Sequence, residues 1–120
     1  MQYSYARVHG IFDRGDIDAA ALRASSAKIA LEHPAEQALG LKLLQFGDAL
    51  QDVLADYRPN QLTNYLYELA KSFSAFFENC PVLKSDSVDQ RDSRLLLCDL
   101  TARTLKQGLA LLGIDVVQKM

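Results

Sequence analysis

Apolar residues recur in the middle of the chain with the period of an α-helix. Between residues 59 and 83 (PNQLTNYLYELAKSFSAFFENCPVL), one apolar stripe advances by steps of four and three residues through Leu62, Leu66, Leu69, Phe73, Phe76 and Cys80. Such steps place side chains on one face of a helix. Pro59 suits a first helical turn, and Pro81 disfavours helical backbone at the residue before it. The pattern therefore predicts a central helix from Pro59 to Asn79.

A second stripe with the same period lies near the end of the chain. It advances by steps of three and four residues through Leu95, Cys98, Ala102, Leu105, Leu109 and Leu112. The polar run before it is typical of a loop, and Gly113 suits the left-handed position that ends many helices. We therefore predict a final helix from Val88 to Leu112, packed antiparallel to the central helix at a crossing angle of about 20°.

Shorter helices are predicted in the first half of the chain. Asp18 is a candidate N-cap for an Ala-rich helix. Pro34 begins another helix, which Gly47 ends, and Asp48 caps the next helix, over ALQDVLADY. Together with a helix over residues 2 to 14, these elements predict an all-α fold, a helical bundle of five to six helices.

The helix predicted over residues 2 to 14 has two faces of different chemistry. Tyr5, Val8 and Phe12 share one side and are expected in the core. The opposite side gathers, within about 60° at 100° per residue, the residues Tyr3, Arg7, Gly10 and Arg14. Unpaired RNA bases stack on aromatic rings and Arg planes, and Arg binds phosphate with two hydrogen bonds. This side is therefore a candidate RNA contact, and the alternative is a solvated face with a half-buried tyrosine.

Composition limits the kind of protein. The 120 residues, 49% of them hydrophobic and 23% charged, fit one globular domain over residues 1–120. No apolar run is long enough for a membrane span, and the polar N-terminus is not a signal peptide. The net charge of −2 argues against holding nucleic acid by bulk electrostatics. It is compatible with a domain that reads a loop while another domain holds the rest of the RNA.

Residues with reactive or metal-binding side chains are few. Cys80 and Cys98 both lie on apolar faces, which favours buried free thiols in a reducing cytoplasm over a disulfide or a metal pair. His9 and His33 have no Cys or Glu at ligand spacing, so we expect no metal site. The sequence has no Gly-rich phosphate loop and no nucleophile with a base at motif spacing. It therefore predicts no catalytic residues.

Three stretches, in order, resemble the C-terminal DALR-type anticodon-binding domain of arginyl-tRNA synthetase. They are QYSYAR (Gln2 to Arg7), the central stretch from residue 59 to 83, and RLLLCDLTARTLKQGLALLGI (Arg94 to Ile114). The likeness covers nearly all of the chain and is weakest over residues 15 to 33. The two ATP-site signatures of that synthetase, His-Ile-Gly-His and Lys-Met-Ser-Lys, do not occur. The resemblance implies a chain without catalysis or cofactor of its own, and a parent arginine–tRNA ligase that uses ATP and Mg²⁺.

The resemblance also implies partners and a site. The partners are the anticodon loop of tRNA(Arg) and the catalytic domain of the same synthetase, in the cytoplasm, with no membrane and no DNA. The opening helix of this family borders the anticodon loop, and its terminal residues fold back beside it. The expected tRNA-binding residues are Tyr3, Arg7, Gly10, Arg14, Lys119 and Met120. The Met120 side chain is expected to pack on a base because it is flexible and polarizable.

Some residues depart from the family, and two other functions stay open. Phe77 stands where the family often has Tyr, and Asn60 and Gln61 replace commoner basic residues. One alternative is the related DALR-type domain of the glycyl-tRNA synthetase β subunit, which serves another tRNA. The other is a helical protein-association module without RNA binding, which the acidic net charge favours.

Overall fold

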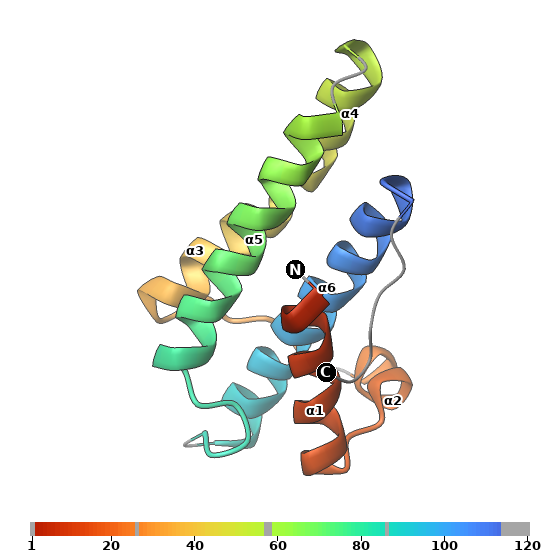
Figure 1. Ribbon diagram of the computed structural model, residues 1–120. Helices are drawn as coiled ribbons and strands as arrows, with labels where there is room; N and C mark the ends of the chain where they lie inside the picture. The colour runs from red at the N-terminus through yellow and green to blue at the C-terminus, as the bar shows by residue number, and fades with distance from the viewer. Residues whose placement is uncertain (1, 26, 57–58, 86, 114–120) are drawn as a thin grey trace.

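The computed structural model describes the backbone of residues 2–25, 27–56, 59–85 and 87–113, and their side chains except those of residues 52–56 and 59. The helices of these ranges are α1 (Gln2–Gly15), α2 (Ala19–Ala24), α3 (Pro34–Leu44), α4 (Phe46–Asp56), α5 (Pro59–Asn79) and α6 (Val88–Leu111). No strand occurs in the part of the chain described (Figure 1). The prediction of an all-α bundle is confirmed.

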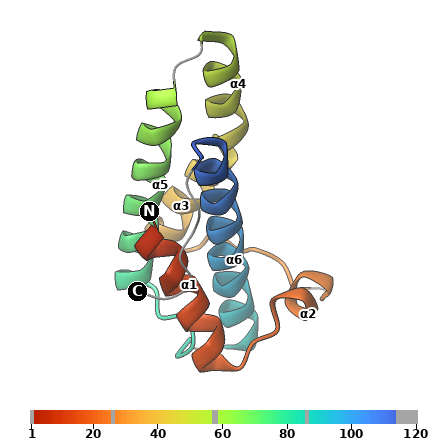
Figure 2. The ribbon, with the colours of Figure 1, turned by 45° about the vertical axis from the view of Figure 1, so that its right-hand side comes forward.

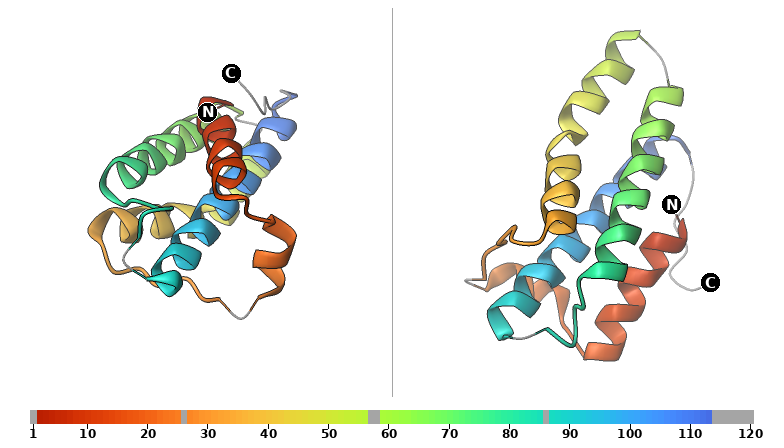
Figure 3. Two further views of the ribbon diagram at one scale, coloured as in Figure 1. Left: turned by 90° about the horizontal axis from the view of Figure 1, so that it is seen from below. Right: turned by 90° about the vertical axis from the view of Figure 1, so that its left-hand side faces the viewer.

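Helices α5 and α6 form the centre of the bundle and run in opposite directions (Figure 1). The six residues of the α5 stripe are all buried, and so are the first five of the α6 stripe. Helices α3 and α4 follow one another along α5, whereas α1 packs across both α5 and α6 (Figure 3). Helix α2 lies apart from α3, α4 and α5, on the α6 side (Figure 2). The predicted bounds of α5 are confirmed, and α6 ends one residue before the predicted end.

Side-chain and backbone caps fix several helix ends. The Asp18 carboxylate accepts hydrogen bonds from the backbone N–H groups of Ala20 and Ala21, as predicted for an N-cap. His33 caps α3 through Nδ1, which accepts from the Ala35 N–H at 3.0 Å. Gly113 has a φ of +77°, which confirms its predicted left-handed position after α6.

The junction of α3 and α4 differs from the prediction. Helix α3 ends at Leu44 with Gln45 as its C-cap, and α4 begins at Phe46, so Gly47 and Asp48 lie inside α4 rather than between the helices. Gly47 does not have the positive φ that would mark a glycine helix end. The Phe46 ring instead stacks on the ring of Tyr65, with centroids 5.8 Å apart, and this tertiary contact lies at the start of α4.

Arg94 is a charged residue of α6 that lies buried in the bundle. Its side chain is only 8% exposed. Nη1 donates to the Pro81 carbonyl at 2.6 Å, and Nη2 donates to Glu36 Oε1 at 3.4 Å. Arg94 thus joins α6 to α3 and to the segment after α5. Helix periodicity could not reveal this burial, because the partner carboxylate lies on another helix.

Candidate nucleic-acid interface

One side of α1 packs against the core, and this leaves the opposite side of the helix at the surface. Tyr5, Val8 and Phe12 are buried, as the sequence predicts, and Ile11 is buried with them. Helical spacing then turns the other side outward. The α1 face consists of Tyr3, Arg7, Gly10 and Arg14, all of them at least partly exposed. The structure therefore brings together the four site residues predicted within the described part of the chain.

The Arg7 guanidinium lies between two aromatic rings from different helices. Its central carbon is 4.5 Å from the Tyr3 ring centroid on α1 and 4.4 Å from the Phe77 ring centroid on α5. Nη2 also donates a hydrogen bond of 2.5 Å to the Tyr3 hydroxyl. We call Tyr3, Arg7 and Phe77 the Arg7 stack. Since both rings restrain the guanidinium plane, less side-chain entropy is lost when its remaining N–H groups meet a base edge or a phosphate.

The C-terminal half of the α1 face, which holds Gly10 and Arg14, borders a hollow. A Cβ added at Gly10 would lie 3.6 Å from Arg14 Nη1, so the Arg14 side chain lies back along α1 over this glycine. The hollow, of about 190 Å³, is lined by Ile11, Arg14, Phe77, Pro81, Val82, Leu83 and Lys84. It offers an apolar wall beside two cations, Arg14 and Lys84. Such a wall suits the face of an unpaired base, and the cations suit its phosphate.

Two residues of this arrangement were missed by sequence reasoning. Phe77 is not among the predicted contacts, although it stands where the family often has Tyr. Lys84 lies in a polar connection where no periodicity applies. The remaining predicted contacts, Lys119 and Met120, lie outside the described residues, and their roles stay predictions.

Comparisons with known proteins agree with this fold. The family model for the DALR anticodon binding domain matches residues 1–120. The chain belongs to this family. The arginine–tRNA ligases of Synechocystis sp. and Shewanella woodyi are 54% and 51% identical to the DALR chain over 120 and 121 residues. Each match covers 100% of the DALR chain and 20% of the relative, so the chain spans about a fifth of the length of these relatives.

Solved structures with the same fold include two that are described as arginyl-tRNA synthetases. Thermus thermophilus arginyl-tRNA synthetase superimposes with a TM-score of 0.81 at 32% identity, over 99% of the DALR chain and 20% of the synthetase. A putative arginyl-tRNA synthetase from Campylobacter jejuni has a TM-score of 0.89 at 24% identity, over 99% of the DALR chain and 25% of that protein, and shows the fold alone. The predicted resemblance to arginyl-tRNA synthetase is confirmed.

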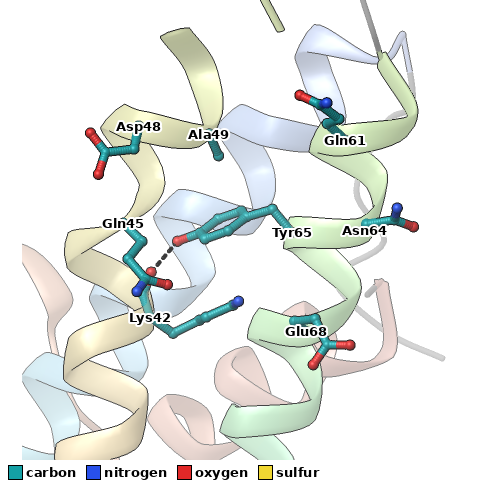
Figure 4. Close-up of a pocket in the computed structure, with 8 residues that line it drawn as sticks. All are labelled: Lys42, Gln45, Asp48, Ala49, Gln61, Asn64, Tyr65 and Glu68. Atoms are coloured by element: carbon teal, nitrogen blue, oxygen red, sulfur yellow. Dashed lines mark hydrogen bonds between the residues drawn. The ribbon is translucent and has the colours of Figure 1, made fainter. Parts of the chain in front are cut away.

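A second hollow of the DALR chain lies between α5 and the α3–α4 junction. The buried Tyr65 phenol donates to the Lys42 carbonyl, and Lys42 Nζ lies 5.3 Å from the Tyr65 ring centroid (Figure 4). The charged residues lining this hollow of about 450 Å³ are one cation and two carboxylates: Lys42, Asp48 and Glu68. Its charge does not favour a nucleic-acid backbone. Tyr65 is thus part of the packing that fixes α3 and α4 on α5.

Burial of Tyr65 predicts a stability loss at alkaline pH. It raises the pKa of the phenol to about 12 from an ordinary value of 10. Between these values the unfolded state loses a proton that the folded state retains, so stability present below pH 10 is lost as the pH rises. We expect Tyr65 to account for a decrease on the order of 2 kcal/mol. Urea unfolding of wild type and Tyr65→Phe between pH 10 and about pH 12 measures this decrease in the free energy of unfolding. The variant should not show the decrease, because it lacks the phenol hydroxyl.

A control separates Tyr65 from other alkaline titrations. Tyr67 lies on the same helix but is 58% exposed. Tyr67→Phe should lose stability with pH as the wild type does. Equal pH profiles for wild type and Tyr65→Phe would contradict the assignment to the buried phenol.

Both cysteines are free and buried, which confirms the predicted thiols. Desolvation by burial raises the pKa of the Cys98 thiol far above its ordinary value, and it raises the pKa of Cys80 in the same way. Within the described ranges no cluster of three His, Cys, Asp or Glu residues could hold a metal ion. None of the described helices is long and apolar enough to cross a membrane.

Thiol labelling provides a direct check of this burial. Since a thiolate is the reactive form, we expect native Cys80 and Cys98 to react with an aromatic disulfide reagent only through unfolding or local opening. Labelling should be slow in buffer and complete within seconds in denaturant. Rapid stoichiometric labelling of the native chain would show that α5 and α6 do not shield these side chains.

Proposed function

We propose that the chain binds the anticodon loop of tRNA(Arg) and forms the anticodon-binding part of an arginine–tRNA ligase. The observation that carries the proposal is the Arg7 stack, a partly exposed guanidinium held between Tyr3 and Phe77 on two helices. The family match and the names of the similar ligases support the same partner. Catalysis with ATP belongs to the remainder of such a ligase, in the cytoplasm, where free cysteines stay reduced.

The chemistry of the α1 face suits an unpaired loop. Tyr3, which is 55% exposed, presents a ring surface for stacking on a base. Arg7 offers N–H groups to a base edge or a phosphate. Arg14 and Lys84 supply positive charge beside the apolar wall of the neighbouring hollow. This local charge permits RNA binding by a chain with a net charge of −2, because the contact depends on a few residues rather than on the whole surface.

A variant at Tyr3 tests the proposal. Tyr3→Ala should weaken binding of a tRNA(Arg) anticodon stem-loop by about 1–3 kcal/mol, the range for loss of one base–aromatic stack. Tyr67→Ala is the matched control, since Tyr67 is also an exposed helical tyrosine but belongs to no part of the Arg7 stack. Fluorescence anisotropy with labelled RNA measures both affinities. The proposal fails if the two variants bind the RNA as well as wild type.

A protein-association function is favoured by one other feature. Leu41 and Leu44 on α3 are 58% and 80% exposed, and one helical turn separates them. Within a longer ligase these side chains are available for contact with another domain. Self-association of the chain that disappears in Leu41→Ser/Leu44→Ser, together with no RNA binding, would favour association over anticodon binding.

A further inference from the structure

A third hollow lies on the far side of α1 from the Arg7 stack. Helices α1, α2 and α6 border this α1–α2–α6 hollow of about 300 Å³. His9 contributes to its lining and is turned roughly 160° from Arg7 at 100° per residue around α1. Tyr5, Val8 and Ala102 form its apolar side, and the Tyr5 and His9 rings lie 4.8 Å apart. The hollow and the Arg7 stack are therefore two separate surfaces of one helix.

Buried Asp99 orders the cations of this hollow. It is 6% exposed and accepts two hydrogen bonds from Arg23, at 2.8 Å from Nε and 2.6 Å from Nη2. Arg103 Nη1 lies 3.8 Å from the same carboxylate. These contacts tie α2 to α6 and neutralise Asp99 within the protein. They use only part of the donor capacity of the two guanidinium groups, which have five N–H donors each.

Cationic side chains outnumber carboxylates in the lining of the α1–α2–α6 hollow. Arg23, Arg103 and Lys106 line it together with two carboxylates, Asp13 and Asp99. Arg103 and Lys106 lie three positions apart on α6, so both side chains reach the same side of that helix. The hollow beside Tyr65 has the opposite balance. On a chain with a net charge of −2, this excess of cations is a local feature.

We propose that the α1–α2–α6 hollow binds a phosphate group of the RNA backbone through Arg103, Lys106 and Arg23. A phosphate suits these residues because guanidinium groups bind it with paired hydrogen bonds and an ammonium group adds a mobile charge. The inference rests on the proposed function for the identity of the RNA. It adds a second contact, on the other side of α1, which fixes the position of the loop without reading its sequence.

Lys106 gives the sharpest test, because its removal leaves the Arg23–Asp99 pair in place. Lys106→Gln should lower the slope of log affinity against log salt concentration by about 0.7, the value for one phosphate contact of a single strand. Lys71→Gln is the matched control, since it removes one exposed helical lysine on α5, outside the hollow. Anisotropy titrations of the 120-residue chain with the tRNA(Arg) anticodon stem-loop at several salt concentrations provide these slopes.

The outcomes separate this inference from the proposed function. Equal changes in slope for Lys106→Gln and Lys71→Gln would overturn the phosphate site, because they would indicate bulk electrostatics. No change for Lys106→Gln, with weakened binding for Tyr3→Ala, would overturn the site and leave anticodon binding intact. A reduced slope for Lys106→Gln with no effect of Tyr3→Ala would support the site and contradict the role of the Arg7 stack.

A second experiment distinguishes binding of an RNA phosphate from binding of a free phosphate ester. Chemical shifts of Arg103 and Lys106 are followed on adding the stem-loop or ATP, each at the same phosphate concentration. We expect the larger shifts with RNA. Shifts with ATP alone, combined with RNA binding that does not depend on Lys106, would overturn the assignment to the RNA backbone.

Discussion

Arg94→Ala is expected to lower the free energy of unfolding by about 3–5 kcal/mol, the usual effect of removing one partner of a buried ion pair. The substitution leaves Glu36, which is 2% exposed, without its cationic partner. It also removes the donor that reaches the Pro81 carbonyl at 2.6 Å. Urea unfolding followed by circular dichroism at pH 7 measures the change.

Two further variants serve as a control and a rescue for this prediction. Arg91→Ala removes an arginine from the same helix, but Arg91 is 39% exposed and pairs with its neighbour Asp92. Its effect should remain within about 0.5 kcal/mol. The double variant Glu36→Leu/Arg94→Met should regain much of the lost stability, because apolar side chains of similar volume often replace buried pairs without cost. Equal losses for Arg94→Ala and Arg91→Ala would contradict the buried role of Arg94.

Arg7→Ala is expected to weaken binding of the tRNA(Arg) anticodon stem-loop by about 1–3 kcal/mol, or roughly 5- to 150-fold. The variant removes the guanidinium and leaves a gap between the Tyr3 and Phe77 rings. Anisotropy titrations measure the affinity, and circular dichroism establishes that the variant is folded. Arg91→Ala again serves as the matched arginine control.

The conservative variant Arg7→Lys separates geometry from charge. Lysine keeps the positive charge but has no planar group that stacks between two rings. We therefore expect most of the affinity lost in Arg7→Ala to be lost in Arg7→Lys as well. Wild-type affinity of Arg7→Lys would mean that charge alone is recognised and that the stacked arrangement has no role in binding.

Much of the helical framework follows from local signals. Pro59 and Asn79 predict the ends of α5 because proline geometry acts within one or two residues. Asp18 and Gly113 predict helix ends by the same kind of local chemistry. The predicted helix end at Gly47 is wrong. A glycine marks such an end when its φ is positive, and the sequence alone does not give φ.

Residues whose role depends on another element are the ones that periodicity misses. Arg94 is buried because Glu36 lies opposite it on α3, 58 residues away in the sequence. Phe77 joins the candidate site because α1 packs on α5, and Lys84 joins it through the connection after α5. Tyr3, Arg7, Gly10 and Arg14 could be grouped in advance because they share one helix. Sequence patterns thus identify one face, and tertiary packing completes the site.

The most direct test of the central proposal is a chemical-shift titration of the chain with the anticodon stem-loop of tRNA(Arg), compared with that of tRNA(Gly), at low salt. We expect shifts at Tyr3, Arg7 and Phe77 that are larger for the arginine RNA, with smaller changes at Arg103 and Lys106. Equal weak shifts scattered over the basic residues, or no shifts with either RNA, would contradict anticodon reading by this chain.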